Sequence, residues 1–207
     1  MNVLVVAPHP DDEALGCGGT IRSHVDGGDR VVVAFLTSGE GGLASYPVER
    51  ARRVREREAQ KAAEVLGVTA HVFLRLRDGR LNEDIPAAAA ALDDIVKTEH
   101  PDVVYAPHEG DGHEDHAAAL AAAATAATPD TELFTYEIWT PLSTFERVED
   151  ITDQMPAKLR AVRSYRSQVR YWRYDLAIKG LNAYRGAMVA GTRYAEVFGV
   201  RAGRAGR

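Results

Sequence analysis

The 207-residue sequence predicts an α/β fold with a mainly parallel sheet covered by helices on both faces. Short apolar runs alternate with longer stretches of helical spacing through the first two thirds of the chain. Polar, glycine-containing loops follow several of the apolar runs. Such alternation is typical of βαβ units, in which successive strands are parallel. The length and the 45% share of hydrophobic residues suit one domain with a full core.

The first unit is a buried strand followed by a helix. Residues 3–7 are five consecutive apolar residues, and the run stops at Pro8. Residues 14–25 have helical spacing and end before Gly27. Gly18 and Gly19 are expected to allow close helix–sheet packing, because a dinucleotide phosphate at this position would lie beside three carboxylates that repel it.

The following units repeat the pattern. The second apolar run is rich in Val, Phe and Leu, and the helix after it is long, charged and closed by a C-terminal glycine, Gly67. A short strand, an alanine-rich helix, a fourth strand, another helix and a fifth strand come next. These predicted strands are residues 31–36, 70–74, 103–106 and 133–138, and the predicted helices are residues 49–66, 86–99 and 115–127.

The last third of the chain has a different pattern. Residues 158–164 and 168–190 carry helical spacing, which predicts two helices packed on the edge of the sheet. Their aromatic residues are expected in the core, with a subunit interface or one wall of a sugar pocket as alternatives: Tyr165, Tyr171, Trp172, Tyr174 and Tyr184. We therefore predict a single domain over residues 1–200 and a frayed tail at 201–207.

Composition excludes several classes of protein. A net charge of −5 argues against a protein that coats nucleic acid. The single cysteine, Cys17, excludes an intramolecular disulfide and any multi-cysteine metal site, and we expect it to be a buried, unreactive thiol. No apolar run approaches the roughly 20 residues that span a bilayer, and the first residues do not resemble a secretory signal. We therefore expect a cytoplasmic protein with no nucleic-acid or membrane partner.

The first chemistry-bearing cluster directly follows the first strand. It contains His9 between two prolines and then three consecutive carboxylates, Asp11, Asp12 and Glu13. Capping of the next helix would explain one Asp. Four ionisable groups in five positions after a buried strand are costly unless a cation neutralises them. Imidazole nitrogen and carboxylate oxygen suit Zn²⁺, with Fe²⁺ as the alternative metal.

The second cluster follows the fourth predicted strand, at the same edge of the sheet. Residues 107–116 hold three of the seven histidines, His108, His113 and His116. A solvated polar loop is the alternative interpretation. Together the two clusters supply His, Asp and His, the ligand set of a catalytic zinc site with one position open. A spare carboxylate, Asp11 or Glu13, would take a proton from a water activated by the metal, which describes metal-assisted hydrolysis.

The two clusters resemble the signature of the LmbE-like (PIG-L) N-acetylglucosaminyl deacetylase family. Residues 7–13 (APHPDDE) with 16–20 (GCGGT) match its first motif, and residues 113–116 (HEDH) are similar to its second motif, His-Pro-Asp-His. Weaker matches follow in the family's order at residues 37–40, 55–59, 78–79, 167–168, 185–186 and 194–198. The sequence departs from the pattern at Glu114, where the family has proline, and at Asp111, where the mycothiol-pathway branch has an aromatic residue.

The resemblance implies a Rossmann-like fold, one zinc ion and a set of roles. The implied metal ligands are His9, Asp12 and His116. The implied general base is Asp11, with protonated His113 stabilising the oxyanion or donating a proton to the leaving amine, and Asp115 orienting an imidazole. The implied substrate contacts are Arg55 and Asp78, with the neighbouring Arg52 or Arg53 as alternatives to Arg55. To these we add Glu40, because its glycine-rich loop should overhang the site.

The sequence therefore predicts a zinc-dependent N-deacetylase that acts on a small N-acetylated amino-sugar glycoside or conjugate. The C-terminal aromatic residues are compatible with a homo-oligomer. The alternatives are a metal-dependent phosphoesterase, an amidase of a thiol conjugate, and a non-catalytic sugar- or nucleotide-binding Rossmann-like module. The sequence does not identify the group attached to the sugar.

Overall fold

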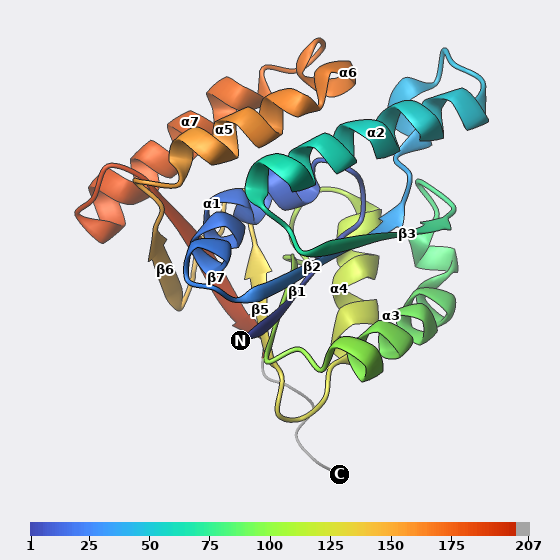
Figure 1. Cartoon of the computed structure of the whole chain (residues 1–207), viewed down its shortest axis with the longest axis horizontal. Coiled ribbons are helices and arrows are strands. Elements are labelled where there is room, and N and C mark those ends of the chain that lie inside the picture. The colour runs from blue at the N-terminus through green and yellow to red at the C-terminus, as the bar shows by residue number, and fades with distance from the viewer. Residues whose placement is uncertain (202–207) are drawn as a thin grey trace.

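The computed structural model describes residues 1–201, and within them the chain forms a seven-stranded sheet with helices on both faces (Figure 1). The strand order is β3-β2-β1-β4-β5-β7-β6. Strands β1 to β5 pair in parallel, whereas β7 is antiparallel to both β5 and β6. This confirms the predicted α/β class.

The parallel part of the sheet is built from β1 (Asn2–Ala7), β2 (Arg30–Thr37), β3 (Ala70–Leu76), β4 (Val103–Pro107) and β5 (Glu132–Tyr136). Strands β1, β2 and β4 are almost wholly buried, which explains their continuous apolar sequences. Strands β1 and β4 lie side by side in the middle of the sheet. The chain adds β2 and β3 on one side of this pair and β5 on the other, so the direction of strand order changes between β1 and β4. Ligands of open α/β sheets bind beyond the carboxyl ends of strands at such a switch point.

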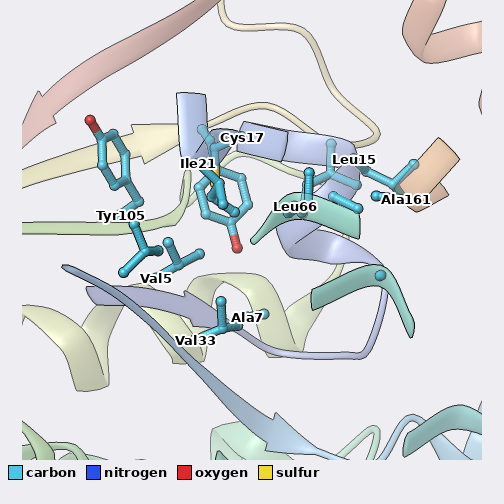
Figure 2. Close-up of a cluster of buried hydrophobic side chains, with 14 of the residues drawn as sticks. Val5, Ala7, Leu15, Cys17, Ile21, Val33, Leu66, Tyr105 and Ala161 are labelled. Atoms are coloured by element: carbon cyan, nitrogen blue, oxygen red, sulfur yellow. The ribbon is translucent and has the colours of Figure 1, made fainter. Parts of the chain in front are cut away.

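Alternate residues of the central strands pack against two separate helical layers. One layer contains α1 (Asp12–Asp26), α2 (Val48–Leu66), α5 (Met155–Ser164) and α7 (Tyr174–Arg185). Val5, Val33 and Tyr105 point into this layer and pack with Ile21 and Leu66 (Figure 2). The opposite layer contains α3 (Ile85–Glu99) and α4 (Glu114–Ala126), which cover the even-numbered residues of β1.

The last third of the chain differs from its prediction. The long expected helix over residues 168–190 is divided into α6 (Arg166–Val169), α7 and a π-helical turn, Gly186–Ala190. Helix α5 packs on α1 and α2 rather than on the sheet edge, because that edge is occupied by β6 (Arg147–Asp150) and β7 (Ala195–Arg201). Arg201 of the predicted tail belongs to β7, and residues 202–207 lie outside the described residues.

A buried ion pair fixes this C-terminal part to α1. Lys158 on α5 and Glu196 on β7 are both buried, with 2.5 Å between Nζ and Oε1. Glu196 also accepts hydrogen bonds from the backbone N–H groups of Gly19 and Thr20, at 2.9 and 2.8 Å. Several donors therefore satisfy this buried carboxylate, as a buried charge requires.

The glycines of α1 are packing positions, but Gly18 and Gly19 do not face the sheet as predicted, and Gly16 makes the close contact with a strand instead. A Cβ on Gly16 would overlap the ring of Tyr136 on β5, and one on Gly19 would lie 2.7 Å from Ile151. Gly18 faces Lys158 of α5. Cys17 is buried between them, and burial raises the pKa of its thiol well above the usual value, as an unreactive thiol requires.

We predict that Gly16→Ala lowers the free energy of unfolding by about 1–3 kcal/mol, because the added methyl group overpacks the contact with Tyr136. Denaturant unfolding followed by circular dichroism measures this. The matched control is Gly180→Ala on the exposed side of α7, where a Cβ meets nothing within 4 Å. Removing glycine from a helix interior there should raise stability by about 0.5–1 kcal/mol. Equal shifts in both variants would contradict the packing role of Gly16.

Candidate metal centre

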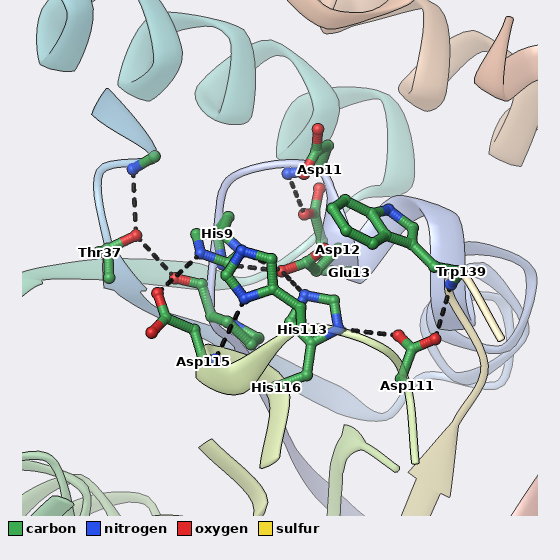
Figure 3. A network of polar contacts seen from close by, with 12 residues as sticks. His9, Asp11, Asp12, Glu13, Thr37, Asp111, His113, Asp115, His116 and Trp139 are labelled. Atoms are coloured by element: carbon green, nitrogen blue, oxygen red, sulfur yellow. Dashed lines mark hydrogen bonds and ion pairs between the residues drawn. The ribbon is translucent and has the colours of Figure 1, made fainter. Parts of the chain in front are cut away.

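The carboxyl ends of β1 and β4 bring the two predicted clusters together. His9 and Asp12 follow β1, while His113 and His116 lie at the start of α4, after β4. The ring centroids of His9 and His116 are 5.6 Å apart, and those of His9 and His113 are 4.8 Å apart. Figure 3 shows these imidazoles converging on Asp12 from different elements.

One group of potential ligands is His9, Asp12 and His116. Asp12 Oδ2 lies 3.0 Å from His9 Nδ1 and 3.5 Å from His116 Nε2. The atoms that these residues offer all lie within 4.8 Å of one another. Asp12 and His116 are buried, and His9 is nearly so. This is a compact set of two nitrogens and one oxygen, which suits a divalent metal.

Carboxylates hold the outward nitrogen of each imidazole. His116 Nδ1 lies 2.8 Å from Asp111 Oδ2, and His9 Nε2 lies 3.1 Å from both Asp115 and Asp78. A carboxylate on one ring nitrogen fixes the ring and leaves the other nitrogen as the donor toward a metal. The nitrogens that these carboxylates do not contact, His9 Nδ1 and His116 Nε2, are the two that face Asp12.

A second group of potential ligands shares His9 and adds His113 and Asp115. The oxygens of Asp115 are already occupied, because they accept from the backbone N–H groups of Gly79 at 2.7 Å and Leu81 at 2.9 Å. His113 Nδ1 accepts the backbone N–H of Asp115 and so caps the start of α4. This second group is therefore the weaker candidate.

The site carries an excess of buried negative charge. Burial alone would lower the pKa of His9, but its contacts with Asp115, Asp12 and Asp78 hold that pKa well above the usual value. Asp12 is also desolvated, yet the neighbouring His116 and His9 lower its pKa to about 2. In these contacts a proton on imidazole neutralises the carboxylates. A divalent cation would do so more completely, so the donor set fits one.

Asp11 lies beside this set in a strained backbone conformation. Its φ of 121° falls in a region that side chains rarely adopt. Glu13 accepts the N–H of Asp11 at 3.1 Å and is itself held by the hydroxyl of Tyr165. Arg55 Nη2 lies 3.3 Å from Asp11 Oδ2. Desolvation, opposed by Arg55, raises the pKa of Asp11 to about 6.

His113 lies at the edge of the site, close to the ring of His9. It is half-buried, and desolvation together with the charge of His9 lowers its pKa. Because Nδ1 accepts a hydrogen bond, the ring proton lies on Nε2. The lowered pKa and the accepting Nδ1 favour a neutral ring, and the predicted role of His113 at the oxyanion or the leaving amine stays a prediction.

The remaining predicted residues fall into two groups. Arg55 and Asp78 line a cavity of about 740 Å³ that also exposes His9, Asp11 and His113. Asp78 Oδ2 accepts the N–H of Gly41 at 2.6 Å. Glu40 is not among the residues that line this cavity; instead its Oε1 lies 2.8 Å from Arg52 Nη2 on α2.

Sequence reasoning missed several residues in and around the site. Asp111 was noted only as a departure from a family pattern, although it lies five positions before His116, within the same polar cluster. Trp139 follows β5, the strand beside β4, so its place at the same sheet edge was an available signal. Gln168 lines the cavity from α6, and only the tertiary structure places it there.

The chain is similar to several known proteins. The family model described as "PIG-L: GlcNAc-PI de-N-acetylase" matches residues 4–127. The chain is similar to the diacetylchitobiose deacetylase of Thermococcus kodakarensis, with 32% identity over an alignment that covers 94% of this chain and 80% of the relative.

Two solved structures are also similar over nearly the whole chain. The conserved protein TT1542 from Thermus thermophilus has 32% identity and a TM-score of 0.84, with 96% of this chain and 94% of that chain covered. The N,N'-diacetylchitobiose deacetylase of Pyrococcus horikoshii, solved with an inhibitor, has 28% identity and a TM-score of 0.83, with 97% and 84% covered. No helix among residues 1–201 combines the length and apolar composition needed to cross a membrane.

We predict that the chelator-treated protein binds one Zn²⁺ per chain and that His116→Ala abolishes this binding, whereas His113→Ala retains it. The reason is that His116 Nε2 is free and faces Asp12, while His113 shares its group with the occupied Asp115. Isothermal titration calorimetry of the metal-free variants measures the stoichiometry. Loss of binding in His113→Ala alone would assign the metal to the other group.

Proposed function

The chain belongs to the PIG-L family of GlcNAc-PI de-N-acetylases, and we propose that it is a zinc-dependent hydrolase that removes the N-acetyl group from a GlcNAc-type glycoside or conjugate. The family is the one predicted from residues 7–13 and 113–116. Two of the similar proteins described above are named as deacetylases of an N-acetylated disaccharide. This supports an acetamido sugar as the substrate and an amide C–N bond as the bond that is cleaved.

One observation carries the proposal. The ligand atoms of His9, Asp12 and His116 all lie within 4.8 Å of one another. His9 and Asp12 line the cavity together with Asp11 and His113. A metal-ligand set, a carboxylate base and a hydrogen-bond donor are the parts that metal-assisted amide hydrolysis needs.

His9, Asp12 and His116 would hold the zinc ion. When bound, zinc lowers the pKa of a water molecule toward neutrality and polarises a carbonyl oxygen. Asp111, Asp115 and Asp78 keep the imidazoles oriented for this task. Their hydrogen bonds also make each ligand nitrogen more basic.

Asp11 would act as the general base. Its carboxylate lines the cavity next to Asp12, and its strained turn is fixed by the N–H contact with Glu13. Arg55 also fixes this turn by donating to the carbonyl oxygen of Pro10. Asp11 takes a proton from the attacking water and passes it to the nitrogen of the leaving amine, which releases acetate and the free amino sugar.

His113 would stabilise the oxyanion as a neutral donor. Its Nδ1 is occupied by the N–H of Asp115, so Nε2 carries the proton. A donor fixed before the reaction loses little free energy to reorganisation as negative charge develops on the acetamide oxygen. This role suits the lowered pKa of the ring better than transfer of a proton.

Arg55 and Asp78 would contact the sugar while holding Asp11 and His9. Both line the cavity, and each already uses part of its hydrogen-bonding capacity within the site. Glu40 keeps a structural role in the proposal, because it pairs with Arg52 on the flank of α2.

We predict that Asp11→Asn and His113→Ala each lower kcat for acetate release by about 10²–10³ while retaining one zinc per chain. A coupled acetate assay on a panel of N-acetylated glycosides, with and without a chelator, measures this. His71→Ala, an exposed histidine on β3, is the matched control and should keep full activity.

Two outcomes would discard the mechanism. Acetate release that persists unchanged in the metal-free protein would exclude the metal. Sugar binding without turnover across the whole panel, in protein that holds one zinc, would instead favour a non-catalytic binding module.

A further inference from the structure

We propose that four aromatic side chains at the cavity mouth form a second subsite, which binds a neutral pyranose ring linked to the reacting acetamido sugar. This set, here called the aromatic rim, consists of Trp139, Tyr171, Trp172 and Tyr174. The inference rests on the proposed deacetylase function and adds a substrate class, an acetamido disaccharide or a longer neutral glycan.

The rim is unusual because large aromatic side chains are left open to solvent. Trp139, Tyr171 and Trp172 are 52%, 67% and 64% exposed. They come from two separate segments, the loop after β5 and the turn between α6 and α7, yet all line the same cavity. Single exposed aromatics are common, but a group around one concave site indicates a binding surface.

The rim is fixed relative to the reacting groups. The backbone N–H of Trp139 donates to Asp111 Oδ1 at 2.8 Å, and the other oxygen of that carboxylate contacts His116. The indole ring lies edge-on to the His113 ring, with centroids 5.4 Å apart (Figure 3). The N–H groups of Tyr171 and Trp172 both donate to the carbonyl of Gln168, at 2.9 and 3.0 Å. The aromatic surface therefore has a defined place beside the proposed reaction centre.

The chemistry of the rim suits a neutral sugar. One face of a pyranose ring presents C–H groups that can lie flat on an indole or phenol ring, while its hydroxyl groups remain available at the ring edge. Gln168, which lines the cavity beside the rim, supplies an amide for those hydroxyls. The cavity volume of about 740 Å³ lies well inside the range of roughly 300–1,000 Å³ typical of small-molecule sites.

An anionic group attached to the sugar finds fewer partners. Among the described residues that line the cavity, Arg55 is the single arginine and there is no lysine. Arg55 already contacts Asp11 and the carbonyl oxygen of Pro10. The arginines beside the rim are also engaged. Arg173 lies 3.3 Å from Asp175, and Arg170 lies over the Tyr171 ring at 5.8 Å. Aromatic stacking is therefore favoured over recognition of a carboxylate or phosphate.

The test compares three substrates with the zinc-loaded enzyme: N-acetylglucosamine, N,N'-diacetylchitobiose and N-acetylglucosaminyl malate. We expect the highest kcat/KM for the neutral disaccharide. Trp172→Ala and Tyr171→Ala should each lower the ratio of kcat/KM for the disaccharide to that for the monosaccharide about tenfold. The matched control is Tyr184→Ala, an exposed tyrosine on α7 that does not line the cavity, and it should leave the ratio unchanged.

An unchanged ratio in both rim variants, or a preference for the malate conjugate, would overturn the proposal. If the wild-type protein releases acetate from none of the three substrates, the proposed function fails and the rim is tested by binding alone. Calorimetry with N,N'-diacetylchitobiose on the metal-free protein should then give a Kd about tenfold weaker for Trp172→Ala than for wild type. Equal Kd values, or no binding to wild type, would exclude the subsite.

Discussion

The structure of the site depends on the burial of carboxylates at the switch point of the sheet. Asp11, Asp12, Glu13, Asp111 and Asp115 are all buried there, and Asp78 is largely covered. Burying several negative charges together is costly unless cations or fixed donors compensate them. Arg55, the imidazoles and backbone N–H groups of residues 11, 79, 81, 139 and 140 provide part of that compensation. The contacts of His9 with Asp115, Asp12 and Asp78 raise its pKa, in keeping with the excess of carboxylates around the potential ligand atoms.

The same constraint explains why the turn after β1 is strained and heavily braced. A chain leaving a buried strand and entering α1 within a few residues must present both Asp11 and Asp12 to one cavity. The positive φ of Asp11 achieves this, and its cost, of order 1–3 kcal/mol, is offset by surrounding contacts. Glu13 accepts a hydrogen bond from the N–H of Asp11 and another from the hydroxyl of Tyr165. Arg55 donates to the carbonyl oxygen of Pro10, the residue before Asp11. Burial raises the pKa of Glu13 to about 8. Glu13 does not line the cavity and both its oxygens have hydrogen-bond partners, so this carboxyl is better suited to structural support than to catalysis.

Local sequence patterns predicted most of the parallel sheet and both chemical clusters. Strands such as β1 and β4 are continuous apolar runs, and the residues after them are neighbours in sequence as well as in space. The failures lie where long-range contacts decide the structure. Strand β6 is four residues long and half exposed, so it has no clear hydrophobic period, and β7 contains the buried Glu196, whose partners come from α1 and α5. Asp111 and Trp139 joined the site through a contact between segments that no periodicity records.

The strand ends and the loops position different parts of the site. The proposed metal ligands and base follow β1 and β4, where the buried sheet fixes their positions. The aromatic rim lies on a loop and a turn, which can vary without moving the sheet. Asp111 is the exception, because one of its oxygens contacts His116 and the other holds the backbone of Trp139. A change at Asp111 would therefore disturb the metal centre and the cavity mouth together, whereas changes at Tyr171 or Trp172 act on the mouth alone. Selectivity for the group attached to the sugar is accordingly expected to depend on the rim, while hydrolysis of the acetamide depends on the strand ends.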